Sequence, residues 1–181
     1  MIRKRMIRLR NDGNSTIADF YAVDEEPQTF QMDIFNWTGS QVVADSAFQN
    51  FFSLSGIVKA ADGNANLSIN SGNLIFPAQE APSQVLFSTR INGTVGGASG
   101  TAREWMIQTR RPNGDIVGSE SSVKVNGTSI SNRDDVLASF TMNELDPFTV
   151  SGIQVGLSNE SGQTITLTSV SVRVQRVISI D

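Results

Sequence analysis

The sequence predicts an all-β fold, an antiparallel β-sandwich of the jelly-roll type. Apolar residues recur with a period of two along most of the chain, and Gly, Asn, Asp and Ser interrupt them at short intervals. A chain of 181 residues is one ordinary domain that is long enough to bury a sizeable core. About ten short strands at this spacing favour a jelly roll over the smaller immunoglobulin fold.

The N-terminal segment, residues 1–27, is expected to form a basic β arm or hairpin ahead of the sandwich of residues 28–181. Arg8 and Arg10 alternate with Ile7 and Leu9, which is strand periodicity. The stretch "NDGNS" then supplies a turn before "TIADFYAV" returns as a second strand. The charged stretch "DEEPQ" interrupts the pattern and predicts the boundary between the two parts.

Two short stretches of the body predict strands with one face turned to the core. In "TFQMDIF" the alternating apolar residues that we expect to face inward are Phe30, Met32 and Ile34. In "SGIQVGL" the corresponding residues are Ile153, Val155 and Leu157. Between them, "DSAFQNFFSL" predicts a short amphipathic helical turn that carries Phe48, Phe51 and Phe52, with a cap at Asp45 or Ser46.

The clearest hairpin lies at Asn113-Gly114, between extended runs over 101–111 and 115–125. An Asn-Gly pair supplies the two positive-φ positions of a type I′ turn, whose twist matches that of paired strands. Trp105 and Ile107 are then expected to point inward from the first strand of this hairpin.

The last strand is expected to contain a β-bulge. In "QTITLTSVSVRVQRV" the apolar residues change parity between Leu167 and Val170. A period-two pattern changes parity only through an extra residue or a kink, so we place the bulge near Thr168 and Ser169.

The composition argues against an enzyme. The chain contains no Cys and no His, which removes thiol nucleophiles, the commonest metal ligand and the commonest general base. The glycine-rich "NGTVGGASGTAREW" lacks the Lys and the helix of a phosphate-binding loop. The adjacent carboxylates Glu25-Glu26 and Asp134-Asp135 would point to opposite faces of a strand, and Asp146 completes no calcium loop with them. We expect no catalytic residues, no metal and no cofactor.

Charge is distributed unevenly, and this limits the possible partners. The net charge is −4, yet five of the fourteen basic residues lie in the first ten positions, which leaves nine basic against eighteen acidic residues elsewhere. An anionic body repels phosphate backbones, so nucleic acid is not an expected partner. No apolar run is long enough to span a bilayer, and the basic start is not followed by the apolar region of a signal peptide, so no membrane partner is expected.

The basic arm is the main candidate for partner binding. Adding its strand to the exposed edge of another subunit would provide main-chain hydrogen bonds, while its cations meet an acidic neighbour. An edge strand of the chain's own sheet, kept soluble by its charges, remains the alternative. The proposed contact residues are Arg3, Lys4, Arg5, Met6, Ile7, Arg8, Leu9 and Arg10.

Exposed aromatic rings are a second option, because sugar-binding faces stack sugar rings on Trp or Tyr. Tyr21 and Trp37, with the loop at 92–100, would form such a glycan-binding site. Packing in the core or at its rim is the alternative role for Trp37.

The stretch from Arg90 to Val174 resembles jelly-roll proteins of tailed-bacteriophage virions, which include capsid decoration or cement proteins and the TNF-like knobs of fibres and needles. The similar features are the Trp strand that leads to "RRPNG", the "DPF" at Asp146 to Phe148, and the Thr- and Val-rich closing strand. The resemblance covers less than half of the chain, which lacks the coiled-coil shaft of a fibre.

The resemblance implies a coat component, commonly trimeric, located in the virion. The expectation is therefore a non-enzymatic structural protein that decorates or cements a phage capsid through its N-terminal arm, with the major capsid protein or other virion subunits as partners and a homotrimer as its assembly. The alternative function is a glycan- or receptor-binding tip of a phage fibre.

Overall fold

The computed structural model contains β-strands and one short 3-10 helix among the residues that it describes. It describes the backbone of residues 3–11, 16–24, 28–77, 82–97, 102–124, 128–141 and 150–179, and the side chains of 31–77, 85–97, 102–121, 128–132 and 150–176. Every strand pairing in these ranges is antiparallel. The predicted all-β class is confirmed.

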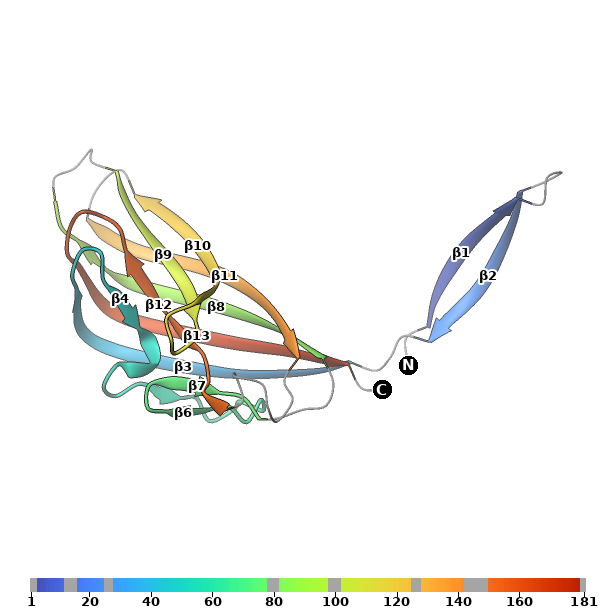
Figure 1. Cartoon of the computed structure of the whole chain (residues 1–181), viewed down its shortest axis with the longest axis horizontal. Coiled ribbons are helices and arrows are strands. Elements are labelled where there is room, and N and C mark those ends of the chain that lie inside the picture. Colours follow the sequence, from blue (N-terminus) through green and yellow to red (C-terminus); the bar gives the residue numbers. More distant parts are fainter. Residues whose placement is uncertain are drawn as a thin grey trace.

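Two sheets pack face to face as a sandwich (Figure 1). One sheet has the strand order β10-β9-β12-β4 and the other the order β11-β8-β13-β3-β5. Apart from β5, which pairs at one edge, the two sheets consist of eight strands: β3 (Gln28–Val43), β4 (Phe48–Asn50), β8 (Pro82–Val95), β9 (Arg103–Arg110), β10 (Ile116–Lys124), β11 (Ser129–Thr141), β12 (Gln154–Asn159) and β13 (Ile165–Ser179).

The pairing of these eight strands defines a jelly roll. The first strand pairs with the eighth, the second with the seventh, the third with the sixth and the fourth with the fifth. This is the pattern of one long antiparallel ribbon that is wound into two sheets. The predicted jelly-roll architecture therefore follows from the strand order itself.

Short elements fill the connection between β4 and β8. They are the 3-10 helix η1 (Phe51–Ser53) and the strands β5 (Val58–Lys59), β6 (Ser68–Asn70) and β7 (Asn73–Ile75). The helical turn predicted here is real but shorter than expected, since Phe48 belongs to β4. Its cap is Asn50, whose side chain accepts a hydrogen bond from the Phe52 N–H at 3.1 Å, instead of Asp45 or Ser46.

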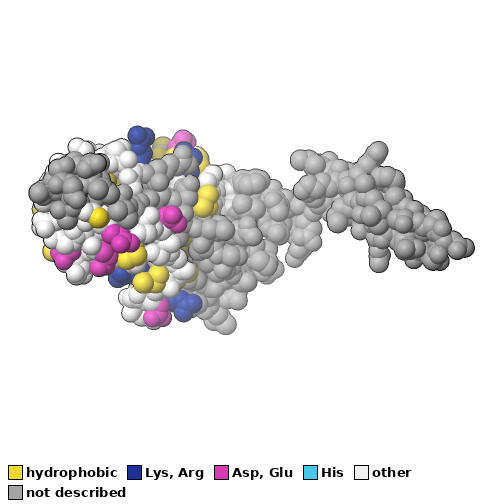
Figure 2. All heavy atoms as spheres, turned by 90° about the horizontal axis from the view of Figure 1, so that it is seen from above, with side chains coloured by type: hydrophobic (Ala, Val, Ile, Leu, Met, Phe, Trp, Pro, Cys, Tyr) yellow, Lys and Arg dark blue, Asp and Glu magenta, His cyan; other side chains and the backbone are white. Residues whose placement is uncertain are grey.

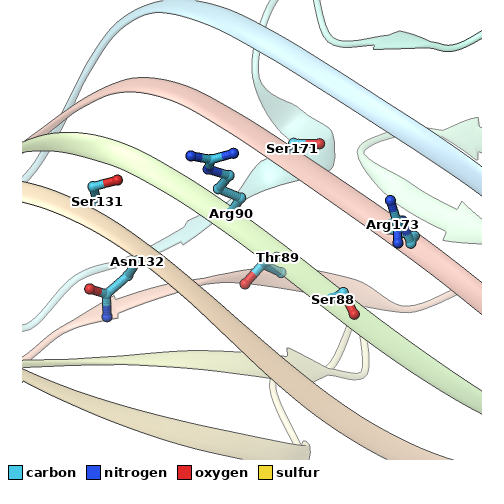
Figure 3. Close-up of a pocket in the computed structure, with 7 residues that line it drawn as sticks. All are labelled: Ser88, Thr89, Arg90, Ser131, Asn132, Ser171 and Arg173. Carbon is cyan, nitrogen blue, oxygen red and sulfur yellow. The ribbon is translucent and has the colours of Figure 1, made fainter.

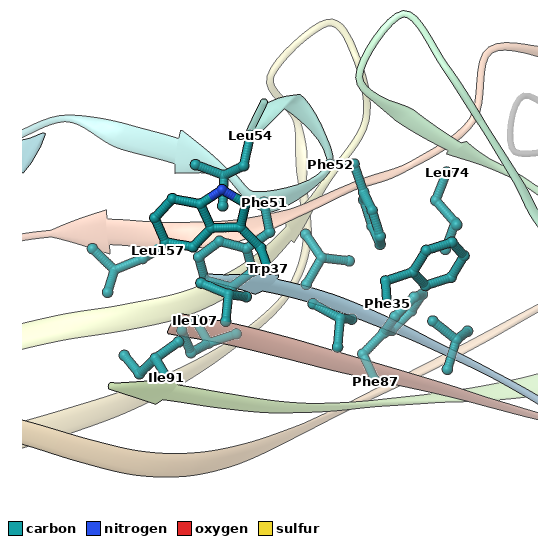
Figure 4. Close-up of a cluster of buried hydrophobic side chains, with 14 of the residues drawn as sticks. Phe35, Trp37, Phe51, Phe52, Leu54, Leu74, Phe87, Ile91, Ile107 and Leu157 are labelled. Carbon is teal, nitrogen blue, oxygen red and sulfur yellow. The ribbon is translucent and has the colours of Figure 1, made fainter. Parts of the chain in front are cut away.

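The hydrophobic core lies between the two sheets and is rich in aromatic rings (Figure 4). Trp105 and Ile107 are buried, as the hairpin pattern predicts. Phe35 and Phe52 meet edge to face, with ring centroids 5.3 Å apart. The prediction that Ile153, Val155 and Leu157 face inward is confirmed, because all three side chains are completely buried.

The predicted inward face of β3 is wrong. Met32 and Ile34 are only half-buried, whereas Asp33, Phe35 and Trp37 face the interior. The strand is apolar on both faces, so its periodicity does not decide between them. Asp33 can lie inside because its carboxylate forms an ion pair with Lys59 and accepts hydrogen bonds from backbone N–H groups. The side chain of Phe30 lies outside the described residues.

The predicted β-bulge in β13 is confirmed. The register with both neighbouring strands shifts between Leu167 and Ser169. On β8, Gly93 lies opposite Leu167, and a Cβ added to it would stand 2.2 Å from the Thr166 carbonyl oxygen. Glycine is therefore required where the bulged strand approaches.

The β9–β10 hairpin exists as predicted, but its turn is of another type. Gly114 has a φ of +95°, whereas Asn113 is not among the residues with positive φ, so the turn is not type I′. The Gly114 N–H donates to the Arg111 carbonyl at 2.9 Å, and the Arg111 N–H donates to the Asp115 carbonyl at 2.8 Å. A type I turn followed by a left-handed glycine explains these bonds, and Pro112 favours it because proline suits its second position.

Hydrophobic side chains form small separate patches on the face drawn in Figure 2. The large hydrophobic residues that are exposed in the described part of the chain lie on several different elements: Val42, Val58, Ile116, Val117 and Val150. No helix in the described ranges is long and apolar enough to cross a membrane.

Candidate functional site

The basic N-terminal segment forms a hairpin of its own. Strands β1 (Arg3–Asn11) and β2 (Thr16–Asp24) pair with each other as a separate two-stranded sheet (Figure 1). Within the described backbone, neither strand joins a sheet of the sandwich. All eight predicted contact residues, 3–10, lie in β1, and their side chains are outside the described set.

The register of this hairpin sorts its residues by face. Directly opposed residues of an antiparallel pair share a face. On one face Ile7 lies opposite Phe20, and Arg3 lies opposite Asp24 on that same face. On the other face Arg8 lies opposite Asp19, and Met6 lies opposite Tyr21. Both faces therefore carry charged and apolar residues, and each strand of the hairpin has one edge that pairs with no described strand.

Trp37, predicted as a possible sugar platform, is buried in the core. Its side chain is 7% exposed, and its indole N–H donates to the Ser55 carbonyl at 3.0 Å. Gly39 packs so closely that an added Cβ would stand 2.6 Å from the Trp37 ring. The ring therefore offers no face to a sugar, and the packing role is the one observed. The side chain of Tyr21 lies outside the described set.

The loop at 92–100 is only partly described. Residues up to Val95 belong to β8, and Gly97 adopts a φ of +91° beside the side chain of Arg103. The strand that follows, β9, replaces the helix that a phosphate-binding loop would need. The side chains of Glu25, Glu26, Asp134, Asp135 and Asp146 lie outside the described set. Among described residues, no three acidic side chains gather as a metal site.

A polar cavity of about 440 Å³ lies on the five-stranded sheet (Figure 3). Its walls come from the three neighbouring strands β8, β11 and β13. Val172, Val174 and Phe87 point into the core, so the alternate residues of the same strands project from the opposite face of the sheet. The cavity is lined by Ser88, Thr89, Arg90, Ser131, Asn132, Ser171 and Arg173.

Two exposed arginines dominate the charge of this cavity. Arg90 extends from β8 toward β13, where Ser171 lies opposite it in the register (Figure 3). Arg173 lies opposite Ser88. Neither guanidinium has a hydrogen-bond or ion-pair partner in the described part of the chain. Both are available to a ligand.

The backbone register adds two further charged residues at this point. Arg133 of β11 is directly opposite Arg90, and Asp135 is directly opposite Ser88. Like charges directly opposite each other destabilise a sheet. The side chains of Arg133 and Asp135 lie outside the described set.

Ser88 contributes an unsatisfied polar group. The side chain is 7% exposed, and its hydroxyl has no hydrogen-bond partner. A buried hydroxyl without a partner costs free energy and marks a place where a ligand or water can bind.

Sequence reasoning did not find this cavity. A local signal is present, since polar residues alternate with valines at 169, 171 and 173, and a polar run at 88–90 precedes Ile91 and Asn92. Each stretch alone is typical of a strand with one face exposed to solvent. Only the pairing of strands some eighty residues apart brings them together, with Arg90 opposite Ser171.

Comparison with known proteins gives a fold likeness only. No protein-family model matches the chain, and no curated protein matches it in sequence. Among solved structures, the chain is similar to one described as "Structure of Eiger TNF from S. frugiperda", with a TM-score of 0.44 and 9% sequence identity. The match covers 83% of this chain and 93% of that one.

Proposed function

We propose that this chain is a non-enzymatic structural protein of a bacteriophage virion that decorates or cements the capsid through its N-terminal hairpin. The observation that carries the proposal is that β1 and β2 pair only with each other within the described backbone. An isolated two-stranded hairpin is marginally stable in water. A surface that receives it would supply the packing that the hairpin lacks.

The hairpin has the features that strand addition needs. Each of its strands has one edge that pairs with no strand of the described backbone, and such an edge can extend the sheet of another subunit. Its apolar pairs, such as Ile7 opposite Phe20, can pack on that subunit. Its cations favour an acidic partner, because complementary charge steers association.

The virion context is supported by the resemblance of the stretch from Arg90 to Val174 to phage jelly-roll proteins. In this proposal the partners are the major capsid protein or other virion subunits, and the chain acts as a homotrimer located in the virion. A protein that binds only the assembled shell stabilises it by mass action. The sandwich then serves as a rigid outer body.

The alternative function is a glycan- or receptor-binding tip of a phage fibre. Burial of Trp37 removes one of the two aromatic rings on which that site was predicted, and the side chain of the other, Tyr21, lies outside the described set. The observation that favours the alternative is the arginine-bearing cavity on β8, β11 and β13.

Co-sedimentation with undecorated phage shells tests the proposed function. The full chain is compared with the variant Arg8→Glu/Arg10→Glu, and Arg111→Glu reverses a charge on the exposed β9–β10 turn as the matched control. We expect the full chain and the Arg111→Glu variant to sediment with the shells and the double variant to stay in solution. Equal sedimentation of all three, or of none, would contradict the proposal.

A further inference from the structure

We propose that the cavity on β8, β11 and β13 binds an acidic sugar, a saccharide unit that carries a carboxylate or a sulfate. The inference does not depend on the hairpin or on its partner. It rests on the two available guanidinium groups, the hydroxyl-rich lining and the size of the cavity.

The anionic part of the ligand is indicated by the arginines. Arg90 and Arg173 lie on neighbouring strands and have no protein partner in the described residues. A carboxylate or sulfate between Arg90 and Arg173 accepts the forked hydrogen bonds that guanidinium groups donate. The register also places Arg133 opposite Arg90 and Asp135 opposite Ser88, so the strand positions at this point of the sheet carry more basic than acidic residues.

The sugar part is indicated by the rest of the lining. Ser88, Ser131 and Ser171 offer hydroxyl groups that both donate and accept, which suits the hydroxyls of a sugar. The Ser88 hydroxyl is buried without a partner and can be satisfied by a ligand hydroxyl. The cavity volume of about 440 Å³ falls in the range of small-molecule sites and is larger than a single ion would occupy.

Calorimetric titration of the full chain tests the assignment with four probes at matched ionic strength: sodium glucuronate, glucose, sodium sulfate and hexaglutamate. We expect glucuronate to bind and glucose to show no binding at the same concentrations. We expect sulfate to compete with glucuronate, since both would occupy the space between the arginines.

Variants locate the binding. Arg90→Gln and Arg173→Gln are each expected to weaken glucuronate binding by at least about tenfold, because a charge-assisted hydrogen bond is lost. Arg90→Lys keeps the positive charge but cannot donate two parallel hydrogen bonds, so we expect a loss of glucuronate affinity between that of the wild type and that of Arg90→Gln. The control Arg111→Gln removes the same charge from the exposed β9–β10 turn and is expected to change binding by less than about twofold.

A stability measurement provides a second readout of the same geometry. Without ligand and at low salt, Arg90→Gln is expected to raise the unfolding temperature, since it removes a like charge from the position opposite Arg133. The proposal is overturned if glucuronate fails to bind, if glucose binds equally well, or if Arg111→Gln weakens binding as much as Arg90→Gln. Binding of hexaglutamate without glucuronate would also overturn it, because the cavity would then receive acidic protein side chains.

Discussion

Asp33 and Lys59 form an ion pair inside the edge of the five-stranded sheet, with the Lys59 Nζ 3.0 Å from Asp33 Oδ2. The Asp33 side chain is completely buried, whereas that of Lys59 is 34% exposed. The same carboxylate accepts hydrogen bonds from the backbone N–H groups of Leu67 at 2.8 Å and Ala65 at 3.3 Å. One side chain thus ties residues 59–67 to β3.

Removing this carboxylate is expected to cost more than removing its cation. Asp33→Ala leaves two buried N–H groups without their acceptor and Lys59 without its counter-charge, with only the Leu67 carbonyl at 3.2 Å still accepting from its Nζ. We expect it to lower the free energy of unfolding by about 3 kcal/mol. Lys59→Ala leaves the carboxylate with its two N–H donors, and we expect a loss of about 1–2 kcal/mol. Urea unfolding measures both values. A larger loss for Lys59→Ala would show that the backbone hydrogen bonds contribute little.

Asn159 is expected to tolerate no acidic replacement. It is completely buried, and its Nδ2 contacts the carbonyl oxygens of Val43, Ala44 and Gln163 at 2.7–3.0 Å. Asn159→Asp would place a carboxylate against three carbonyl oxygens, with an expected cost of about 3 kcal/mol or more. Thermal unfolding compares it with Asn36→Asp on the exposed side of β3, for which a change below about 0.5 kcal/mol is expected. Similar losses for the two variants would argue against the Asn159 network.

The β-bulge in β13 makes a steric prediction for β8. A Cβ at position 93 would stand 2.2 Å from the Thr166 carbonyl oxygen and 3.0 Å from the Leu167 Cα. Both of these atoms are backbone, so Gly93→Ala forces the strands apart, and we expect a cost of about 2–3 kcal/mol. Thr94→Ala, at the next and exposed position, is the control and should cost less than about 1 kcal/mol. Equal unfolding midpoints for the two variants would contradict the close approach.

The β9–β10 turn can be assigned by two substitutions. Gly114 has positive φ and no atoms within 4 Å of an added Cβ, so Gly114→Ala is expected to cost about 1 kcal/mol through backbone strain alone. Asn113→Ala is expected to cost about 0.5 kcal/mol, because it loses two exposed hydrogen bonds: the one that its side chain accepts from the Asp115 N–H and the one that its Nδ2 donates to Asp115 Oδ2. Denaturant unfolding separates these values. A type I′ turn would instead make Asn113→Ala as costly as Gly114→Ala.

The local periodicity of apolar residues is sufficient to predict much of the fold. Alternation alone placed Trp105, Ile107 and the inward residues of β12 in the core, and a change of parity located the bulge between Leu167 and Ser169. These features depend on neighbours in the chain. The number and spacing of the strands predict the jelly-roll class, but they do not predict which strands pair.

Two of the three failures have non-local causes. The face of β3 was assigned wrongly because the partner that allows Asp33 to be buried, Lys59, lies 26 residues away. The turn type has a local cause, since Pro112 suits the second position of a type I turn and outweighs the preference of the Asn-Gly pair for type I′. The cavity could not be predicted, since Arg90 and Arg173 meet only through the register of β8 with β13.

Amide hydrogen exchange of residues 3–24, measured in the free chain and in the chain bound to undecorated phage shells, tests the central claim most directly. We expect rapid exchange across β1 and β2 in the free chain, because an isolated hairpin is marginally stable, and a slowing of about 100-fold or more on the shell. Exchange in β8 and β13 should be the same in both states. Equal exchange of the hairpin amides with and without shells would contradict the account.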